Sequence, residues 1–280
     1  MKKIIAAFDG LKFSDSTKDF AVQLAKQSSA HLVGVFLDDF TYHSYKIYEL
    51  VNKDGGIDEE KHKKLEKSDQ RARNEAVDHF TKACREAGVN YSIHHDKSIA
   101  LHELLHESIY ADLLVIENKE TLTHYEETVP TRFIRDLLSE AQCPVLVVPK
   151  KYKPIDKLVL LYNGQPSSVH AIRTFSYLFP ELKYLETEAL SVRRSLNNRH
   201  VPDNRLVKEF MKRHFPQANF TVLNGYADIE IPESLKAQQN NVLVVLGAYE
   251  RSRVSRWFRE SMADILMEQV DAPLFIAHSK

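Results

Sequence analysis

The sequence lacks the features that mark secreted, membrane-spanning or nucleic-acid-binding proteins. Cysteine occurs only twice, at Cys84 and Cys143, so we expect two reduced, buried thiols and no disulfide framework. No apolar run reaches the roughly 18 residues that a membrane span needs. Lys plus Arg (38) nearly balance Asp plus Glu (39), which argues against nucleic acid or an anionic membrane as a partner. We therefore expect a cytoplasmic globular protein.

Glycine is also scarce, with eight residues in the whole chain. No phosphate loop and no glycine-rich dinucleotide fingerprint occurs. The opening segment MKKIIAAFDGL has a charged start and an apolar stretch, as a signal peptide does. Asp9 and Gly10 interrupt that stretch and no cleavage site follows, so we interpret it as a first strand.

The same order of elements is predicted twice along the chain. In the first half, apolar runs predict strands at 2–8, 31–37, 91–94, 111–117 and 143–149, and helical spacing predicts helices at 14–25, 59–87, 99–110 and 131–141. In the second half, strands are expected at 157–162, 186–192, 219–224, 241–247 and 272–277, and helices at 167–178, 207–215, 229–238 and 260–270. The closing phrases QCPVLVVP and DAPLFIAH correspond.

Strands that alternate with helices predict a parallel sheet covered on both faces. The continuous apolar runs LLVI, VLVV and NVLVVL fit strands that are buried on both sides. The prediction is an α/β protein of two tandem, doubly wound, five-stranded parallel-sheet domains. Their ranges are 1–150 and 151–280, and the polar, proline-bearing stretch KKYKPID (150–156) is the boundary.

The longest predicted helix, 59–87, is rich in charged residues of both signs, which indicates a solvated outer face. Its apolar face is expected to be formed by Leu65, Ala72, Ala76, Phe80 and Ala83. Gly88 is the predicted stop, because glycine readily adopts the left-handed conformation that ends helices.

A five-strand unit that opens with an apolar strand and Asp-Gly and closes with Cys-Pro-Val-Leu-Val-Val resembles the universal stress protein family. The resemblance covers nearly the whole chain, twice, and so implies a tandem form. Members of that family often bind ATP through a motif after the fourth strand. The motif is Gly, two residues, Gly, nine residues, Gly, then Ser or Thr. Its glycines let backbone N–H groups approach phosphates at a helix start.

In the second half this spacing falls on Gly247, Glu250, Glu260 and Ser261, so only the first glycine and the serine match. Glutamate at a glycine position blocks close approach of a phosphate and repels its charge. Four arginines in the same loop, Arg251, Arg253, Arg256 and Arg259, could compensate by clamping phosphate, or could form a solvated basic face. Trp257 and Phe258 are expected to pack against the last helix or a domain interface.

In the first half the same spacing falls on Glu117, Glu120, Pro130 and Thr131, so only the hydroxyl residue matches. The resemblance also implies a nucleoside contact from the aspartate that ends the first strand. Asp9, followed by Gly10, occupies that position.

In the second half Asn163, followed by Gly164, is the uncharged replacement for that aspartate. Each half thus retains different parts of a nucleotide site and neither retains all of them.

One segment carries a different chemistry: ALHELLHES contains the HExxH pattern of zinc hydrolases at His102 and His106. Both histidines would share one face of a helix, at the solvent edge of an apolar stripe formed by Leu101, Leu104, Leu105 and Ile109. A third ligand is required, and His94, His95 and Asp96 precede the helix. We take the pattern as a chance match and expect no metal.

The sequence therefore predicts a non-enzymatic stress-response protein with degenerate nucleotide sites and no required cofactor. A nucleotide sensor that binds ATP through the second half, with slow ATPase activity, is the alternative, and a zinc hydrolase is the remote one. The resemblance implies an intramolecular pseudo-dimer paired through the last strands, at 143–148 and 273–277. No specific residue in the sequence predicts or excludes further assembly of two chains into a homodimer.

Overall fold

The computed structural model describes residues 1–37, 44, 50–51, 57–96, 99–123, 125–194, 200–247 and 261–277. The first half contains β1 (Lys3–Asp9), α1 (Asp15–Ser28), β2 (His31–Leu37), α2 (Glu59–Ala87), β3 (Tyr91–Asp96), α3 (Ala100–Ser108), β4 (Leu113–Glu117), α4 (Arg132–Glu140) and β5 (Val145–Val148). None of the described helices is long and apolar enough to cross a membrane.

The second half repeats this order. It contains β6 (Lys157–Leu161), α5 (Pro166–Leu178), a short 3-10 helix η2 (Pro180–Tyr184), β7 (Glu186–Arg193), α6 (Asn204–His214), β8 (Asn219–Asn224), α7 (Ala227–Lys236), β9 (Val242–Gly247), α8 (Met262–Gln269) and β10 (Leu274–Ala277). The sequence analysis did not predict η2, and it placed each of the other described elements within a few residues of its bounds.

The ten strands in the described part of the chain form one sheet in the order β3-β2-β1-β4-β5-β10-β9-β6-β7-β8. Pairing is parallel within each half, as the apolar runs predict, and antiparallel only where β5 meets β10. At this seam Leu146 lies opposite Phe275. Both residues are buried, so the core runs without a break from one half into the other.

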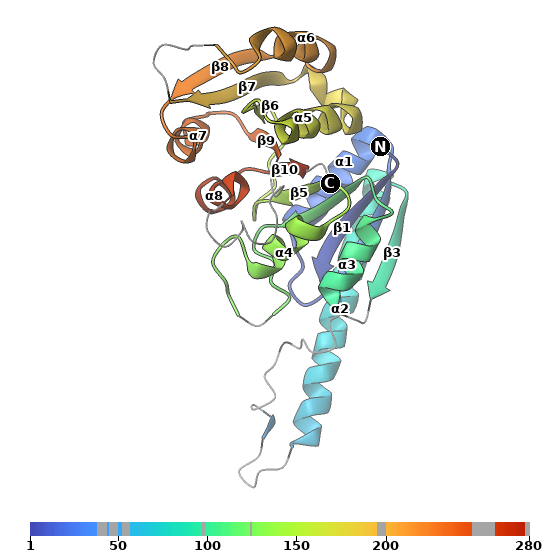
Figure 1. Cartoon of the computed structure of the whole chain (residues 1–280). Helices are drawn as coiled ribbons and strands as arrows, with labels where there is room; N and C mark the ends of the chain where they lie inside the picture. The colour runs from blue at the N-terminus through green and yellow to red at the C-terminus, as the bar shows by residue number, and fades with distance from the viewer. Residues whose placement is uncertain are drawn as a thin grey trace.

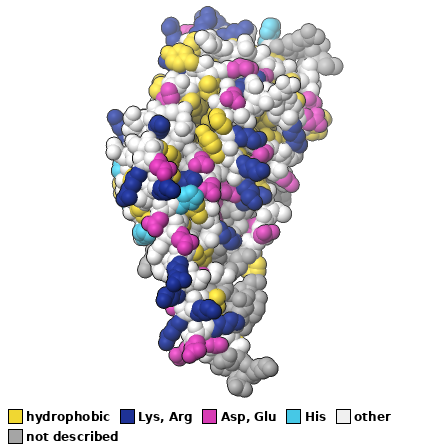
Figure 2. Space-filling model, turned by 180° about the vertical axis from the view of Figure 1, so that it is seen from behind, with side chains coloured by type: hydrophobic (Ala, Val, Ile, Leu, Met, Phe, Trp, Pro, Cys, Tyr) yellow, Lys and Arg dark blue, Asp and Glu magenta, His cyan; other side chains and the backbone are white. Residues whose placement is uncertain are grey.

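Helices cover both faces of the sheet (Figure 1). One core cluster joins the sheet to α1, α2, α5 and α6, and the other joins it to α3, α4, α7 and α8. Each half thus contributes two helices to each face, as a doubly wound fold requires. On the back of the molecule, Lys and Arg side chains alternate with Asp and Glu (Figure 2), in keeping with the net charge of −1.

Helix α2 has the predicted bounds and extends well beyond the end of the sheet (Figure 1). Asp58 caps its start by accepting a hydrogen bond from the Lys61 N–H, and Gly88 ends it with φ of 68°. The predicted apolar face was only partly right. Ala76 and Phe80 are buried, whereas Leu65, Ala72 and Ala83 are half-buried, and Cys84, four positions after Phe80, is buried in place of Ala83.

Candidate functional site

The strand order creates one crevice in each half. The chain leaves β1 on the side of β2 and returns through β4 on the other side, so the carboxyl ends of β1 and β4 mark the point where the winding reverses. The same holds for β6 and β9. Ligands of open α/β sheets bind at such points. The predicted site residues Asp9, Gly10, Asn163, Gly164 and Gly247 all lie at these carboxyl ends.

In the first half the crevice is lined by carboxylates. Asp9 ends β1, is buried, and accepts a hydrogen bond from the Leu11 N–H to its Oδ1 at 2.7 Å, which closes a tight turn around the buried Gly10. Glu117 ends β4 and accepts a hydrogen bond from the Ser14 hydroxyl. Ser14 also caps α1, so the start of this helix is tied directly to the crevice.

Glu120 lies in the turn that follows β4. Its Oε1 accepts hydrogen bonds from the N–H groups of Thr121 and Leu122, at 2.9 and 3.0 Å. Burial and the negative charges of Asp9 and Glu117 together raise the pKa of Glu120 to about 7, although the hydrogen bonds from Leu122 and Thr121 lower it. A phosphate brought here would meet three acidic groups instead of N–H donors.

The hydroxyl residue that matches the nucleotide motif in this half has a structural task. Thr131 is buried and caps α4 by accepting a hydrogen bond from the Ile134 N–H at 3.2 Å. Its own hydroxyl donates to the carbonyl oxygen of Glu120. Pro130 precedes it and offers no N–H to a ligand. Thr131 therefore fixes the turn after β4 to the start of α4, and both of its roles are met within the protein.

In the second half the crevice is differently built. Asn163 is exposed, and its Oδ1 accepts a hydrogen bond from the Gln165 N–H at 2.9 Å. This is the same turn that Asp9 makes in the first half. Gly164 follows with φ of 83°, and a Cβ at this position would lie 2.7 Å from the Cβ of Pro202. The segment that precedes α6 thus closes over the end of β6.

Gly247 ends β9 at the position of the motif's first glycine. A Cβ here would lie 2.5 Å from the backbone carbon and oxygen of Ser167, in the first turn of α5. Glycine is therefore required by the packing of α5 against β9, whatever binds in the crevice. Ser261 accepts a hydrogen bond from the Asp264 N–H at 3.1 Å, and Asp264 accepts one from the Ser261 N–H at 3.0 Å. This capping box starts α8.

The rest of the second motif lies outside the described residues. This segment holds the remaining predicted positions, which are Glu250, Arg251, Arg253, Arg256, Trp257, Phe258, Arg259 and Glu260. The predicted phosphate clamp by arginines and the predicted packing of the two aromatic residues therefore remain predictions.

Comparison with known proteins decides the family. The model of the universal stress protein family matches residues 1–149, which is more than half of the chain. The chain belongs to the universal stress protein family. A search of curated proteins finds no match.

Two crystal structures show the same fold over almost the whole chain. A universal stress protein from Archaeoglobus fulgidus DSM 4304 has 10% sequence identity and a TM-score of 0.71, and the match covers 99% of this chain and 96% of that one. A putative universal stress protein from Pseudomonas aeruginosa UCBPP-PA14 has 12% identity and a TM-score of 0.63, with 99% and 93% covered. At these identities the likeness establishes the fold alone.

In this member of the family, the zinc-hydrolase pattern lies on an exposed helix face. His102 and His106 are both exposed on α3, as the apolar stripe predicts. The stripe itself is shorter than predicted, because α3 ends at Ser108 and Ile109 is 55% exposed. Within the described residues, no group of three or more His, Cys, Asp or Glu side chains could hold a metal ion.

Among the residues considered as a third zinc ligand, His94 has another partner. His94 Nδ1 lies 2.5 Å from Glu107 Oε1, and Lys3 Nζ donates to Glu107 Oε2 at 3.1 Å. Burial alone would raise the pKa of Glu107, but the hydrogen bonds and positive charges of His94 and Lys3 lower it. This network joins α3 to strands β1 and β3. His95 instead packs against the ring of Phe36.

Two contacts that shape the crevices were not predicted from the sequence. Ser14 was expected to start a helix, but its bond to Glu117, 103 residues away, was not expected. Gly247 was assigned to a ligand, although the backbone of Ser167 occupies the space beside it. An N-cap serine that comes a few residues after an Asp-Gly strand end is a usable signal for the first contact. No local signal exists for the second.

Proposed function

We propose that the chain is a non-enzymatic stress-response protein whose two crevices are no longer nucleotide sites. The observation that carries this proposal is the carboxylate cluster of Asp9, Glu117 and Glu120 in the first half. Two unit charges 4 Å apart repel by about 1 kcal/mol in water and by several times more near a protein interior. ATP bound here would face that repulsion from more than one side, so the residues present do not fit the nucleotide.

The second half supports the same proposal by a different route. The glycine that could admit a phosphate, Gly247, faces the backbone of Ser167. The serine that could bind a phosphate, Ser261, is engaged in the capping box of α8. Asn163 carries no charge and accepts a hydrogen bond from its own turn. Each retained motif residue thus has a role in the fold that explains its presence.

Isothermal titration calorimetry with ATP and Mg²⁺ tests the proposal on the full chain. We expect no saturable binding at micromolar nucleotide, and no hydrolysis of ATP above the background rate. The Glu117→Gln/Glu120→Gln variant is expected to bind more tightly than the native chain if repulsion is the obstacle. Micromolar binding by the native protein would refute the proposal.

The alternative is a nucleotide sensor that binds ATP in the second half. Two matched variants distinguish it from the proposal. Ser261→Ala and Thr131→Ala each remove one helix cap, so both should lower the free energy of unfolding by a similar amount. ATP binding that is lost only in Ser261→Ala would assign the nucleotide to the second half. Gly247→Glu is unsuitable for this purpose, because the Ser167 backbone leaves no room for the side chain.

We further propose that residues 1–150 and 151–280 are two domains that act as an intramolecular pseudo-dimer. The antiparallel pairing of β5 with β10 supports this, as does the contact of Arg135 in α4 with Asp264 in α8, at 4.0 Å across the seam. Light scattering is expected to give the mass of one chain, 32.3 kDa. A stable species of twice that mass would show that two such chains assemble further into a homodimer.

A further inference from the structure

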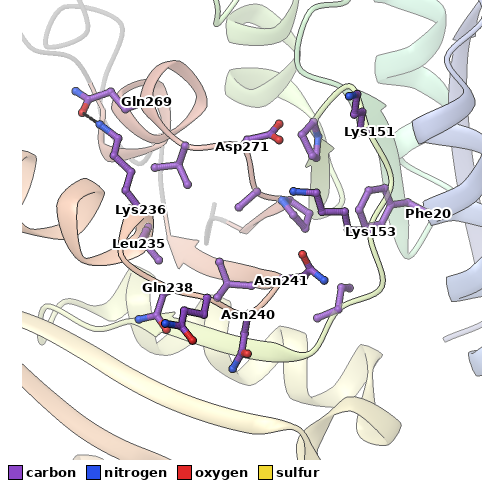
Figure 3. Close-up of a pocket in the computed structure, with 17 residues that line it drawn as sticks. Phe20, Lys151, Lys153, Leu235, Lys236, Gln238, Asn240, Asn241, Gln269 and Asp271 are labelled. Atoms are coloured by element: carbon purple, nitrogen blue, oxygen red, sulfur yellow. Dashed lines mark hydrogen bonds between the residues drawn. The ribbon is translucent and has the colours of Figure 1, made fainter.

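A cavity of about 430 Å³ lies at the seam between the two halves and shares no lining residue with either crevice. Its walls come from three parts of the chain that are distant in sequence. These are the linker between β5 and β6, the turn after α7, and the turn after α8 (Figure 3). Its volume lies within the range of small-molecule sites.

The floor of the cavity is apolar and well packed. Phe20 of α1, Leu235 of α7 and Val242 of β9 line it and are all buried. The ring of Phe20 also packs edge-on against Tyr152, with centroids 4.7 Å apart. Tyr152 lies between Lys151 and Lys153 in the linker, so this contact holds both lysines at the cavity's edge.

Positive charge dominates the walls. Three lysines line the cavity, Lys151, Lys153 and Lys236, against one acidic residue, Asp271, which leaves a net charge of +2 on the lining. Figure 3 shows Lys151 and Lys153 on the linker side and Lys236 beside Gln269 on the other. Neither linker lysine forms an ion pair with a described residue.

The remaining polar groups are four amides, Gln238, Gln239, Asn240 and Asn241, which follow one another along one wall. Two of them have partners in the protein: Gln238 Oε1 accepts a hydrogen bond from Lys157 Nζ at 3.1 Å, and the Asn240 amide group donates to Glu186 at 3.4 Å. The Asn241 amide group donates to Asp156 at 2.9 Å, which leaves its carbonyl oxygen as an acceptor.

We propose that this cavity binds a small organic anion that also carries hydroxyl groups, such as a sugar phosphate or a hydroxy acid. Lys151 and Lys153 bind the anionic group, and the Gln239 amide and the Asn241 carbonyl oxygen bind the hydroxyls. The ligand contacts the linker on one side and the turns after α7 and α8 on the other. Its binding therefore fastens the linker to the second half, at a place unrelated to the nucleotide crevices.

Calorimetric titration of the full chain tests this with three probes, glucose 6-phosphate, 3-phosphoglycerate and citrate, beside inorganic phosphate and glucose alone. We expect at least one of the three to bind saturably, and more tightly than phosphate or glucose. The Lys151→Gln/Lys153→Gln variant should bind it about fivefold more weakly, as expected for two exposed ion pairs. The charge-matched control is Lys26→Gln/Lys150→Gln, at two exposed positions outside the cavity, and it should bind as the native chain does.

Three results would overturn the proposal. Absence of saturable binding for all three probes would show that the cavity is not such a site. Equal weakening in both double variants would show an effect of net charge alone. Phosphate or glucose binding as tightly as the best probe would show that the combination of anion and hydroxyls is not what the cavity recognises.

Discussion

Replacing Glu120 by glutamine should change how the stability of the protein depends on pH. Glutamine keeps the side-chain oxygen that accepts hydrogen bonds from the N–H groups of Thr121 and Leu122. It removes the negative charge that Glu120 would otherwise place beside Asp9 and Glu117. The substitution therefore isolates the electrostatic part of the cluster from its hydrogen bonds.

The sign and size follow from the pKa of Glu120, which is raised from 4.5 to about 7. A carboxyl whose pKa is higher in the folded chain stabilises the fold while it is protonated. That stability is fully present below pH 4.5 and is lost as the pH rises through 7. Integrating the difference in proton binding between pH 5 and pH 8 gives a loss of roughly 2–3 kcal/mol for the native protein. The variant has no such loss from this position.

Urea unfolding followed by circular dichroism at pH 5, 6, 7 and 8 measures this difference. The native chain should lose roughly 2–3 kcal/mol more than Glu120→Gln between pH 5 and pH 8. Glu126→Gln, at an exposed glutamate in the same loop, is the control and should behave as the native chain does. If the native protein and Glu120→Gln differ by the same amount at pH 5 and pH 8, the pKa of Glu120 is not raised in the folded chain.

Three further results are expected. Gly247→Ala should lower the free energy of unfolding, measured in urea, by about 2–3 kcal/mol, because its Cβ would overlap the backbone of α5. Gly88→Ala, the control, should lower it by only about 1 kcal/mol, because of the positive φ at that position. Equal losses in the two variants would contradict the packing argument. Thr131→Ala should cost about 1 kcal/mol through loss of the α4 cap, and a change below about 0.3 kcal/mol would show that the cap contributes little. Burial raises the pKa of Cys84 and of Cys143 to about 12. Both thiols should therefore resist a disulfide reagent at pH 8 until guanidinium unfolds the chain. Rapid reaction of the folded protein would refute their burial.

Much of the fold could be predicted because its signals are local. Helix α2 was predicted at its full length, with Gly88 as its stop, and the structure adds the Asp58 cap at its start. Helix α3 was predicted too long, because Ile99 and Ile109 extend the apolar pattern at both ends. Neither is buried in the structure, and Ile99 supplies no side-chain cap. Apolar spacing alone thus predicts that each helix exists, whereas the capping residues determine where it ends.

The sites were harder to predict because they depend on packing between distant segments. Counting along the motif placed Glu117, Glu120 and Thr131 at the first crevice, since the strand and helix that carry them are adjacent in sequence. The contact between Ser167 and Gly247 depends instead on how closely α5 crosses β9. The seam cavity depends on how the linker passes the turns after α7 and α8. Neither distance is encoded in a short stretch of sequence.

The two crevices show that retained motif residues need not indicate a retained ligand. Asp9 and Asn163 make the same turn at the end of the first strand of each half, and an uncharged amide serves that turn as well as a carboxylate. Thr131 and Ser261 each cap the helix that follows the fourth strand. Gly247 admits the backbone of α5. All five residues are therefore explained by the fold, whereas the motif positions that only a phosphate would need are occupied by glutamate or proline. In this chain, the matches at the turn and cap positions therefore indicate the fold and do not by themselves indicate a nucleotide.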